Sequence, residues 1–148
     1  MNSRDASVVA LSLSSERGIP KENVDRVTLV ENWGISGDAH AGDWHRQVSL
    51  LAMESIESMY AKGVKVRPGA FAENITTQFI TLPTLAIGSR LRIGPTLLEV
   101  TQIGKECHAR CAIYYAAGDC VMPREGIFAR VLEGGAISVG DPVQVCGV

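Results

Sequence analysis

The residues best suited to chemistry lie between positions 105 and 111, in the sequence KECHARC. This segment places Cys107, His108 and Cys111 beside Lys105 and Arg110. The thiolate is the reactive form of cysteine, and a nearby Lys, Arg or protonated His favours it. Thiolates also bind soft metals and molybdenum-like centres. The segment therefore predicts a reactive thiol or a thiolate metal ligand. The alternative is that both cysteines are small buried side chains after a strand.

A zinc site is another interpretation of the same region. Four residues would supply enough nitrogen and sulfur ligands: Cys107, His108, Cys111 and Cys120. However, three residues separate the first two cysteines, and no second close pair follows them. Two adjacent ligands such as Cys107 and His108 would also need an awkward turn to reach one ion. The spacing therefore favours a thiol site over structural zinc.

A second polar group occupies the glycine-rich stretch at 34–44 and the residues just after it. It contains two aspartates, two histidines and an arginine: Asp38, His40, Asp43, His45 and Arg46. One interpretation is a loop whose Asp and His side chains bond to its own backbone. The other is an anion site, because Arg46 and Gln47 come just before an expected helix and a planar guanidinium suits phosphate. Both interpretations stay open at this point.

Composition limits the classes of protein that these residues can serve. The 148 residues predict a single domain over 1–148, and 46% hydrophobic with 20% charged residues argues against disorder. A net charge of −2 gives no basic excess to drive binding to nucleic acid or to a membrane surface. No apolar run reaches the roughly 18–20 residues of a membrane span. Ser12 to Ser15 interrupt the apolar run near the N-terminus, so we expect a cytoplasmic protein.

The sequence pattern predicts that the secondary structure positioning these residues is mainly β. We expect strands at 8–13 and 27–30, a hairpin over 90–101 turning at Gly94-Pro95, and a closing strand at 143–145. Helical spacing of apolar residues predicts two short helices, near 50–62 with Ser49 as N-cap and near 124–133. Since the helices do not alternate with strands, a β-barrel decorated by two helices fits better than a doubly wound sheet.

These segments together resemble the MOSC domain, named for the C-terminal region of molybdenum cofactor sulfurase. The matching segments are Gly34–Ile56, Arg67–Ile75, Ile87–Cys111 and Gly126–Val143. The combination of GD-H-G, RQVSLL, PG-F-EN, a cysteine after a strand and a final GDPV is fairly specific. The chain departs from the family at Ala72, where the family often has glycine before its Glu-Asn pair.

The resemblance implies a mixed-direction β-barrel of the pyruvate-kinase-barrel kind and an association with molybdenum cofactor (molybdopterin), a pterin dithiolene bearing a phosphate. Cys107 and Cys111 are both eligible as the family's reactive or metal-binding cysteine. We favour Cys107, which lies nearer the strand end and follows Lys105. It would carry a persulfide or bind molybdenum, with Cys111 as resolving or alternate thiol.

The remaining site residues receive roles from the same hypothesis. Arg46, Lys105 and Arg110 would hold the phosphate or lower the thiol pKa, and His45 and His108 would transfer protons. The side chains of Gln47 and Asn74 would contribute to cofactor binding, with Asn74 facing a pterin edge.

The resemblance gives one leading function and two alternatives. The leading function is sulfur carriage or transfer, with sulfur supplied by a partner cysteine desulfurase that uses pyridoxal phosphate and passed to molybdoenzyme partners. The first alternative is a non-catalytic carrier of the cofactor. The second is a molybdenum-dependent reductase of N-hydroxylated compounds, for which 148 residues leave little room.

Overall fold

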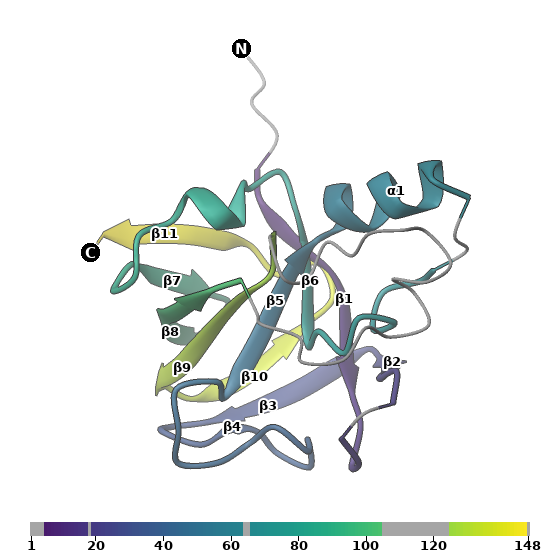
Figure 1. Ribbon diagram of the computed structural model, residues 1–148. Coiled ribbons are helices and arrows are strands. Elements are labelled where there is room, and N and C mark those ends of the chain that lie inside the picture. Colours follow the sequence, from purple (N-terminus) through teal and green to yellow (C-terminus); the bar gives the residue numbers. More distant parts are fainter. Residues whose placement is uncertain (1–4, 18, 64–65, 105–124, 148) are drawn as a thin grey trace.

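A computed structural model describes residues 5–17, 19–63, 66–104 and 125–147 of the chain. These residues are mainly β, with one α-helix, α1 (Met53–Ala61), and one short 3-10 helix, η1 (Leu82–Thr84) (Figure 1). The strands are β1 (Ser7–Leu13), β2 (Glu22–Val24), β3 (Arg26–Val30), β4 (Gly34–Ile35), β5 (Val48–Ala52), β6 (Ile75–Gln78), β7 (Arg90–Ile93), β8 (Thr96–Ile103), β9 (Ile127–Glu133), β10 (Gly135–Ser138) and β11 (Val143–Gly147).

The strands form a large sheet and a small one. The large sheet has the order β11-β7-β8-β9-β5-β6-β1-β2, and the small sheet has the order β10-β3-β4. β5 and β6 pair in parallel, whereas the other described pairs are antiparallel. The expected mainly β fold with mixed strand direction is therefore confirmed.

The expected closed barrel is not confirmed. No ladder joins the two outer strands of the large sheet, β11 and β2, in the described part of the chain. The start of β11 instead meets the start of β1 through an isolated bridge between Ser7 and Pro142 and a hydrogen bond from Val143 N to Ala6 O of 2.9 Å. The large sheet curls back on itself at this point without continuous strand pairing.

The sequence predicts several strands correctly. β1 and β3 coincide with the two β-rich runs near the N-terminus, and β11 is the expected closing strand. β7 and β8 form the expected hairpin, in which Ile93 pairs with Thr96 across the turn at Gly94-Pro95. A two-residue loop of this kind commonly needs a positive φ, which Gly94 supplies at 52°.

The predicted helix near 124–133 is wrong in its described part, because residues 127–133 form β9. This strand lies between β8 and β5 and pairs with both. Residues buried on both faces of a central strand read as a nearly continuous apolar run. Here Ile127, Phe128, Ala129 and Val131 are all buried, and their spacing imitates one face of a helix.

The first predicted helix exists but begins later than expected. β5 occupies residues 48–52, all buried, and α1 starts at Met53. Ser49 is consequently not the N-cap, and its hydroxyl instead donates to Asn74 Oδ1 at 3.1 Å. Gly63 follows α1 with a φ of 88° and is the expected C-terminal stop. The helix lies beyond the end of β5, at the upper right of Figure 1.

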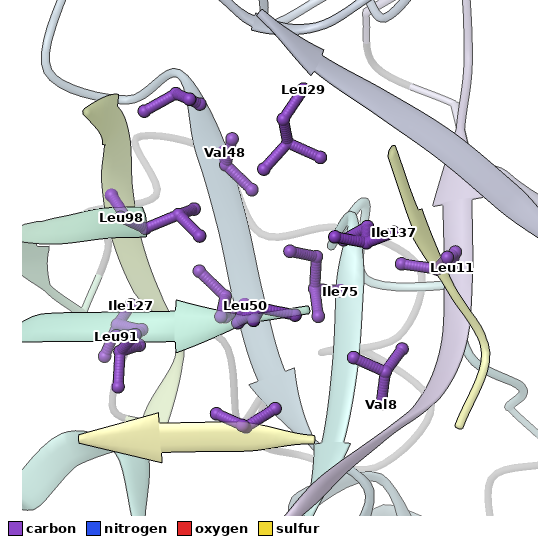
Figure 2. Packing of buried hydrophobic residues seen from close by; sticks show 14 of the residues in the cluster. Val8, Leu11, Leu29, Val48, Leu50, Ile75, Leu91, Leu98, Ile127 and Ile137 are labelled. Carbon is purple, nitrogen blue, oxygen red and sulfur yellow. The ribbon is translucent and has the colours of Figure 1, made fainter. Parts of the chain in front are cut away.

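Most of the apolar core lies between the two sheets. Figure 2 shows Leu29 of β3 and Ile137 of β10 facing the same interior as Val48 of β5 and Ile75 of β6. A smaller apolar cluster contains Leu51, Ile56, Met59, Phe71 and Phe128. Phe128, the second residue of β9, is buried in this cluster, and the Arg46 guanidinium lies over its ring.

Candidate functional site

Two residues near the end of β8, Thr101 and Gln102, form hydrogen bonds with His45 and Arg46, which follow the glycine-rich loop. Gln102 Oε1 lies 2.9 Å from Arg46 Nε, which donates to it, and 2.9 Å from His45 Nε2. The Gln102 amide nitrogen donates to the carbonyl oxygen of Gly104 at 2.9 Å. The hydroxyl of Thr101 donates to the His45 carbonyl oxygen. The structure therefore joins the predicted residues His45 and Arg46 to the strand end that directly precedes the 105–111 segment in sequence.

Arg46 lies over an aromatic side chain at the start of β9. Its guanidinium carbon lies 5.2 Å from the centre of the Phe128 ring, in a cation–π arrangement, and the side chain is partly exposed. Among residues 5–17, 19–63, 66–104 and 125–147, no carboxylate forms an ion pair with Arg46. Its Nε donates to Gln102, and no residue that the structure describes bonds to its two Nη atoms, the edge suited to a planar, bidentate contact.

A close approach of the backbone shapes the loop that delivers these side chains. Gly34 begins the loop with a φ of 124°, and a Cβ added there would lie 2.7 Å from the carbonyl oxygen of Gln47. Only glycine fits this approach without moving the backbone. The start of the loop therefore lies against its end, which orders His45 and Arg46 just before β5.

Gln47 and Asn74 connect buried strands in this structure. Gln47 Oε1 accepts a hydrogen bond from Val131 N at 2.9 Å, and its amide nitrogen donates to Asn32 at 3.3 Å. Asn74 Oδ1 accepts from Ser49 N at 3.0 Å, and its amide nitrogen donates to the Ser12 carbonyl oxygen at 3.2 Å. Both side chains are buried, so their polar atoms satisfy neighbouring backbone groups. Their predicted cofactor contacts remain predictions.

Asp38 and His40 belong to a buried ionic cluster centred on Lys21. Lys21 Nζ lies 2.7 Å from Asp38 Oδ1 and 2.9 Å from His40 Nδ1, and only 1% of the Lys21 side chain is exposed. Burial by itself raises the pKa of Asp38, but hydrogen bonds from His40, Lys21 and the Ser14 backbone hold that pKa well below its usual range. Asp38 also accepts from the backbone N–H groups of Ser14 and His40. This agrees with the interpretation in which the loop's aspartate bonds to backbone.

Lys21 also ties the glycine-rich loop to the loop at 67–74. Its backbone N–H donates to Gly69 O at 2.9 Å, while Arg67 donates to its carbonyl oxygen at 2.9 Å. Within this second loop, Glu73 accepts hydrogen bonds from Gly69 N, Phe71 N and the Thr76 hydroxyl. Burial nevertheless raises the pKa of Glu73, because desolvation disfavours its charged form. The two loops are therefore held as one unit.

The loop at 67–74, the strand on which Gln102 lies and all but the first three residues of the glycine-rich loop fall within one region recognised by comparison. The sequence profile of the MOSC domain matches residues 37–144. The chain belongs to the MOSC domain family. The matched region contains Arg46, Gln102 and Phe128, whereas Lys21 lies before it and anchors Asp38 from outside.

Solved structures share the fold of this MOSC domain. The YUAD protein from Bacillus subtilis has a TM-score of 0.80 at 19% identity, with 96% of each chain covered. YiiM from Geobacillus stearothermophilus has a TM-score of 0.69 at 19% identity, covering 95% of this chain and 74% of that protein. YiiM from Escherichia coli has a TM-score of 0.66 at 20% identity, covering 97% and 69%. At these identities the likeness shows the fold alone. No curated protein matches the chain.

The remaining predicted site residues of this MOSC domain lie outside the described residues. They are Cys107, His108, Cys111, Lys105 and Arg110, together with Cys120 of the zinc interpretation. In the part that the structure describes, no group of three or more His, Cys, Asp and Glu side chains could hold a metal ion. The described helices also include none with the length and hydropathy that a membrane crossing needs.

Sequence reasoning missed three residues that build the site: Lys21, Gln102 and Phe128. A lysine in a polar loop normally indicates a solvated side chain, so Lys21 gave no signal of burial. Phe128 was assigned to the apolar face of a helix. Gln102 gave no signal either, because β8 also carries Thr96, Glu99 and Thr101, and nothing in its sequence distinguishes the glutamine from these polar residues.

Proposed function

We propose that this MOSC domain binds molybdenum cofactor through its phosphate, which Arg46 would receive, and handles sulfur at Cys107. The proposal rests on one observation above all. A partly exposed arginine, stacked on Phe128 and without a carboxylate partner among the described residues, is fixed by Gln102 at the end of β8. Lys105 and Cys107 follow that strand end in the sequence.

The described residues fit the anionic part of such a cofactor. A guanidinium whose Nη edge has no partner among the described residues suits a phosphate, and the His45 ring lies beside it on Gln102. The described residues form no metal site of their own, and the cofactor would bring its metal with it. When bound, the cofactor would supply the molybdenum centre. The chain would contribute the anion contact at Arg46 and one thiolate, Cys107 in our proposal.

The sulfur step that we propose is thiol–persulfide exchange at Cys107, with Cys111 as the alternate thiol. The Cys107 thiolate would attack the terminal sulfur of a donor persulfide. A new sulfur–sulfur bond forms on Cys107, the donor's own sulfur–sulfur bond breaks, and the donor leaves as a thiolate. The persulfide proton stays with the transferred sulfur, so no external oxidant or reductant is required. A pyridoxal phosphate-dependent cysteine desulfurase is the class of partner that produces such persulfides.

Thiol chemistry of this kind belongs in a reducing compartment such as the cytoplasm, where cysteines remain unpaired. Lys105, Arg110 and His108 would favour the Cys107 thiolate by their positive charge.

The proposal is tested on protein produced in cells that make molybdenum cofactor. Native mass spectrometry and metal analysis of the purified chain should show a bound pterin together with molybdenum. Stoichiometric zinc in place of both would contradict the proposal and support a zinc site at the cysteines. Treatment with a persulfide donor should add one sulfur atom, about 32 Da in mass, to the peptide that contains Cys107, and addition only elsewhere would contradict the sulfur step.

A further inference from the structure

We infer that Gln102 is the positioning residue of the anion site. It would set the direction of the Arg46 guanidinium and of the His45 ring, and tie both to the strand end before the 105–111 segment. The inference rests on the proposed function, because it assigns a role within the same site. No sequence motif pointed to Gln102, and the assignment comes from its contacts alone.

An irregularity in β8 explains why Gln102 can reach both partners. The register of β8 against β9 shifts between Val100 and Gln102, which pair with the adjacent residues Ala129 and Phe128. Thr101 is therefore the extra residue of a β-bulge. In a regular strand, neighbouring side chains point to opposite faces, yet Thr101 and Gln102 both bond to His45. Bulges commonly redirect a side chain next to a functional site, and this one brings Gln102 to the loop.

The hydrogen bonds fix the orientation of the Gln102 amide. Its nitrogen can only donate, and it faces the Gly104 carbonyl oxygen at 2.9 Å. Its oxygen can only accept, and the Arg46 Nε–H group reaches it at 2.9 Å. The same oxygen requires that His45 present Nε2–H, at 2.9 Å. A neutral His45 therefore keeps Nδ1 as its acceptor nitrogen, and the orientation of three groups follows from one side chain.

This arrangement predicts what the site selects. Because Nε is occupied, Arg46 offers an anion only the edge formed by its two Nη atoms. That edge matches two oxygens of a phosphate group. Nδ1 of a neutral His45 can accept a hydrogen bond from a ligand or from water. The ligand class is therefore an anion with two oxygens on one face and a hydrogen-bond donor nearby, and the phosphate of the cofactor in our proposed function meets both conditions.

The test uses Gln102→Leu and Gln102→Glu, with inorganic phosphate as the probe. Gln144 on β11 is an exposed strand glutamine, so Gln144→Leu and Gln144→Glu are matched controls. Nuclear magnetic resonance of the ¹⁵N-labelled chain would follow the Arg46 Nε–H signal, its exchange with water and its shift on phosphate addition. Urea unfolding of each variant would report stability separately.

The two Gln102 substitutions should affect the Arg46 Nε–H exchange rate differently, while both weaken phosphate binding. Gln102→Leu removes the acceptor, so Nε–H exchange should accelerate and the phosphate Kd should weaken by about tenfold. Gln102→Glu keeps the acceptor, so exchange should stay slow, while its carboxylate competes with phosphate and also weakens the Kd. A residue that only supports the fold would not separate exchange from affinity. The Gln144 variants should match the wild type in both.

Two results would overturn the inference. One is unchanged Nε–H exchange and phosphate affinity in Gln102→Leu. The other is fast Nε–H exchange in the wild type, which requires no variant to fold. The proposed function fails differently, if phosphate leaves the wild-type Arg46 signal unmoved while its exchange is slow. The two failures are thereby distinguishable.

Discussion

Replacing Lys21 with methionine should destabilise the fold strongly, because it breaks a buried ion pair from one side. Lys21 Nζ lies 2.7 Å from Asp38 Oδ1, and the two side chains are 1% and 0% exposed. Methionine keeps most of the volume and removes the charge. The Asp38 carboxylate would then keep the backbone N–H groups of Ser14 and His40 as donors, with His40 Nδ1 at 3.7 Å from Oδ2.

The expected cost follows from the burial of the pair. Removing one partner of a buried ion pair costs about 3–5 kcal/mol, since the other charge stays desolvated. Domains are stable by about 5–15 kcal/mol in total, so the loss is a large share of the whole. With a urea slope of about 2 kcal/mol per M, the unfolding midpoint should fall by about 2 M.

The loss of stability in Lys21→Met should become smaller as the pH falls. The pKa of Asp38 is lowered in the folded state, so its contribution is complete above the unfolded value of about 3.9 and is lost as the pH falls below it. In Lys21→Met the burial remains while the lysine is lost, so the folded pKa of Asp38 should rise above its unfolded value. Protonation then relieves the buried charge, and the gap between variant and wild type should narrow from pH 7 toward pH 4.

Urea denaturation at pH 7 and pH 4 measures both effects. The control is Arg92→Met, because Arg92 pairs with Glu133 at 3.3 Å on the surface, with 36% and 58% exposure, and such a pair contributes about 0–1 kcal/mol. Lys21→Met with Asp38→Asn should recover part of the loss, since no unpaired charge remains. A loss no larger than that of Arg92→Met would refute the assignment of Lys21 as the anchor of the two loops.

Four further outcomes are expected, three from the structure and one from the sequence. Ala72 has a φ of 64°, so Ala72→Gly should raise the free energy of unfolding by about 0.5–1 kcal/mol, measured in urea. Gly63 has a φ of 88°, and a Cβ added there would have no atom within 4 Å, so Gly63→Ala should lower the free energy of unfolding by about 1–2 kcal/mol through backbone strain alone. Burial raises the pKa of Glu73, so the stability of the wild type relative to Glu73→Gln should decline as the pH rises above about 4.5, and a pH-independent difference would contradict this sign. Brief iodoacetamide treatment at neutral pH should label Cys107 before Cys146, which is exposed, and peptide mapping that finds Cys146 labelled first would remove the argument for a lowered thiol pKa.

Local patterns were enough to predict the strands whose faces differ in polarity. Arg90 and Arg92 alternate with Leu91 and Ile93 along β7, and the turn at Gly94-Pro95 follows directly. The pattern failed at β9, because neighbours on both sides and apolar residues on both faces remove the alternation that distinguishes strand from helix. The first helix was predicted to begin too early for a similar reason, since β5 is buried throughout.

The sequence was enough to identify some residues of the candidate site, but not the contacts that they form. Arg46 and His45 were identified from a loop rich in glycine and charge, and the structure places them together on Gln102. Gln102 itself depends on a bulge in β8, and Lys21 depends on burial by two loops distant in sequence. Both are tertiary effects, which the order of neighbouring residues does not encode.

The most direct test of the central claim compares two arginines in protein made by cells that produce molybdenum cofactor. Arg46 stacks on Phe128 of β9 and has no carboxylate partner among the described residues. Arg130 lies two residues after Phe128 on the same strand and pairs with Glu99 at 2.9 Å. The measurement is the molar ratio of bound pterin to protein in Arg46→Ala, Arg130→Ala and the wild type. We predict that Arg46→Ala retains at most about a tenth of the wild-type pterin, from loss of a charge-assisted contact, while Arg130→Ala retains all of it. Equal pterin content in the two variants would contradict the claim that Arg46 holds the cofactor.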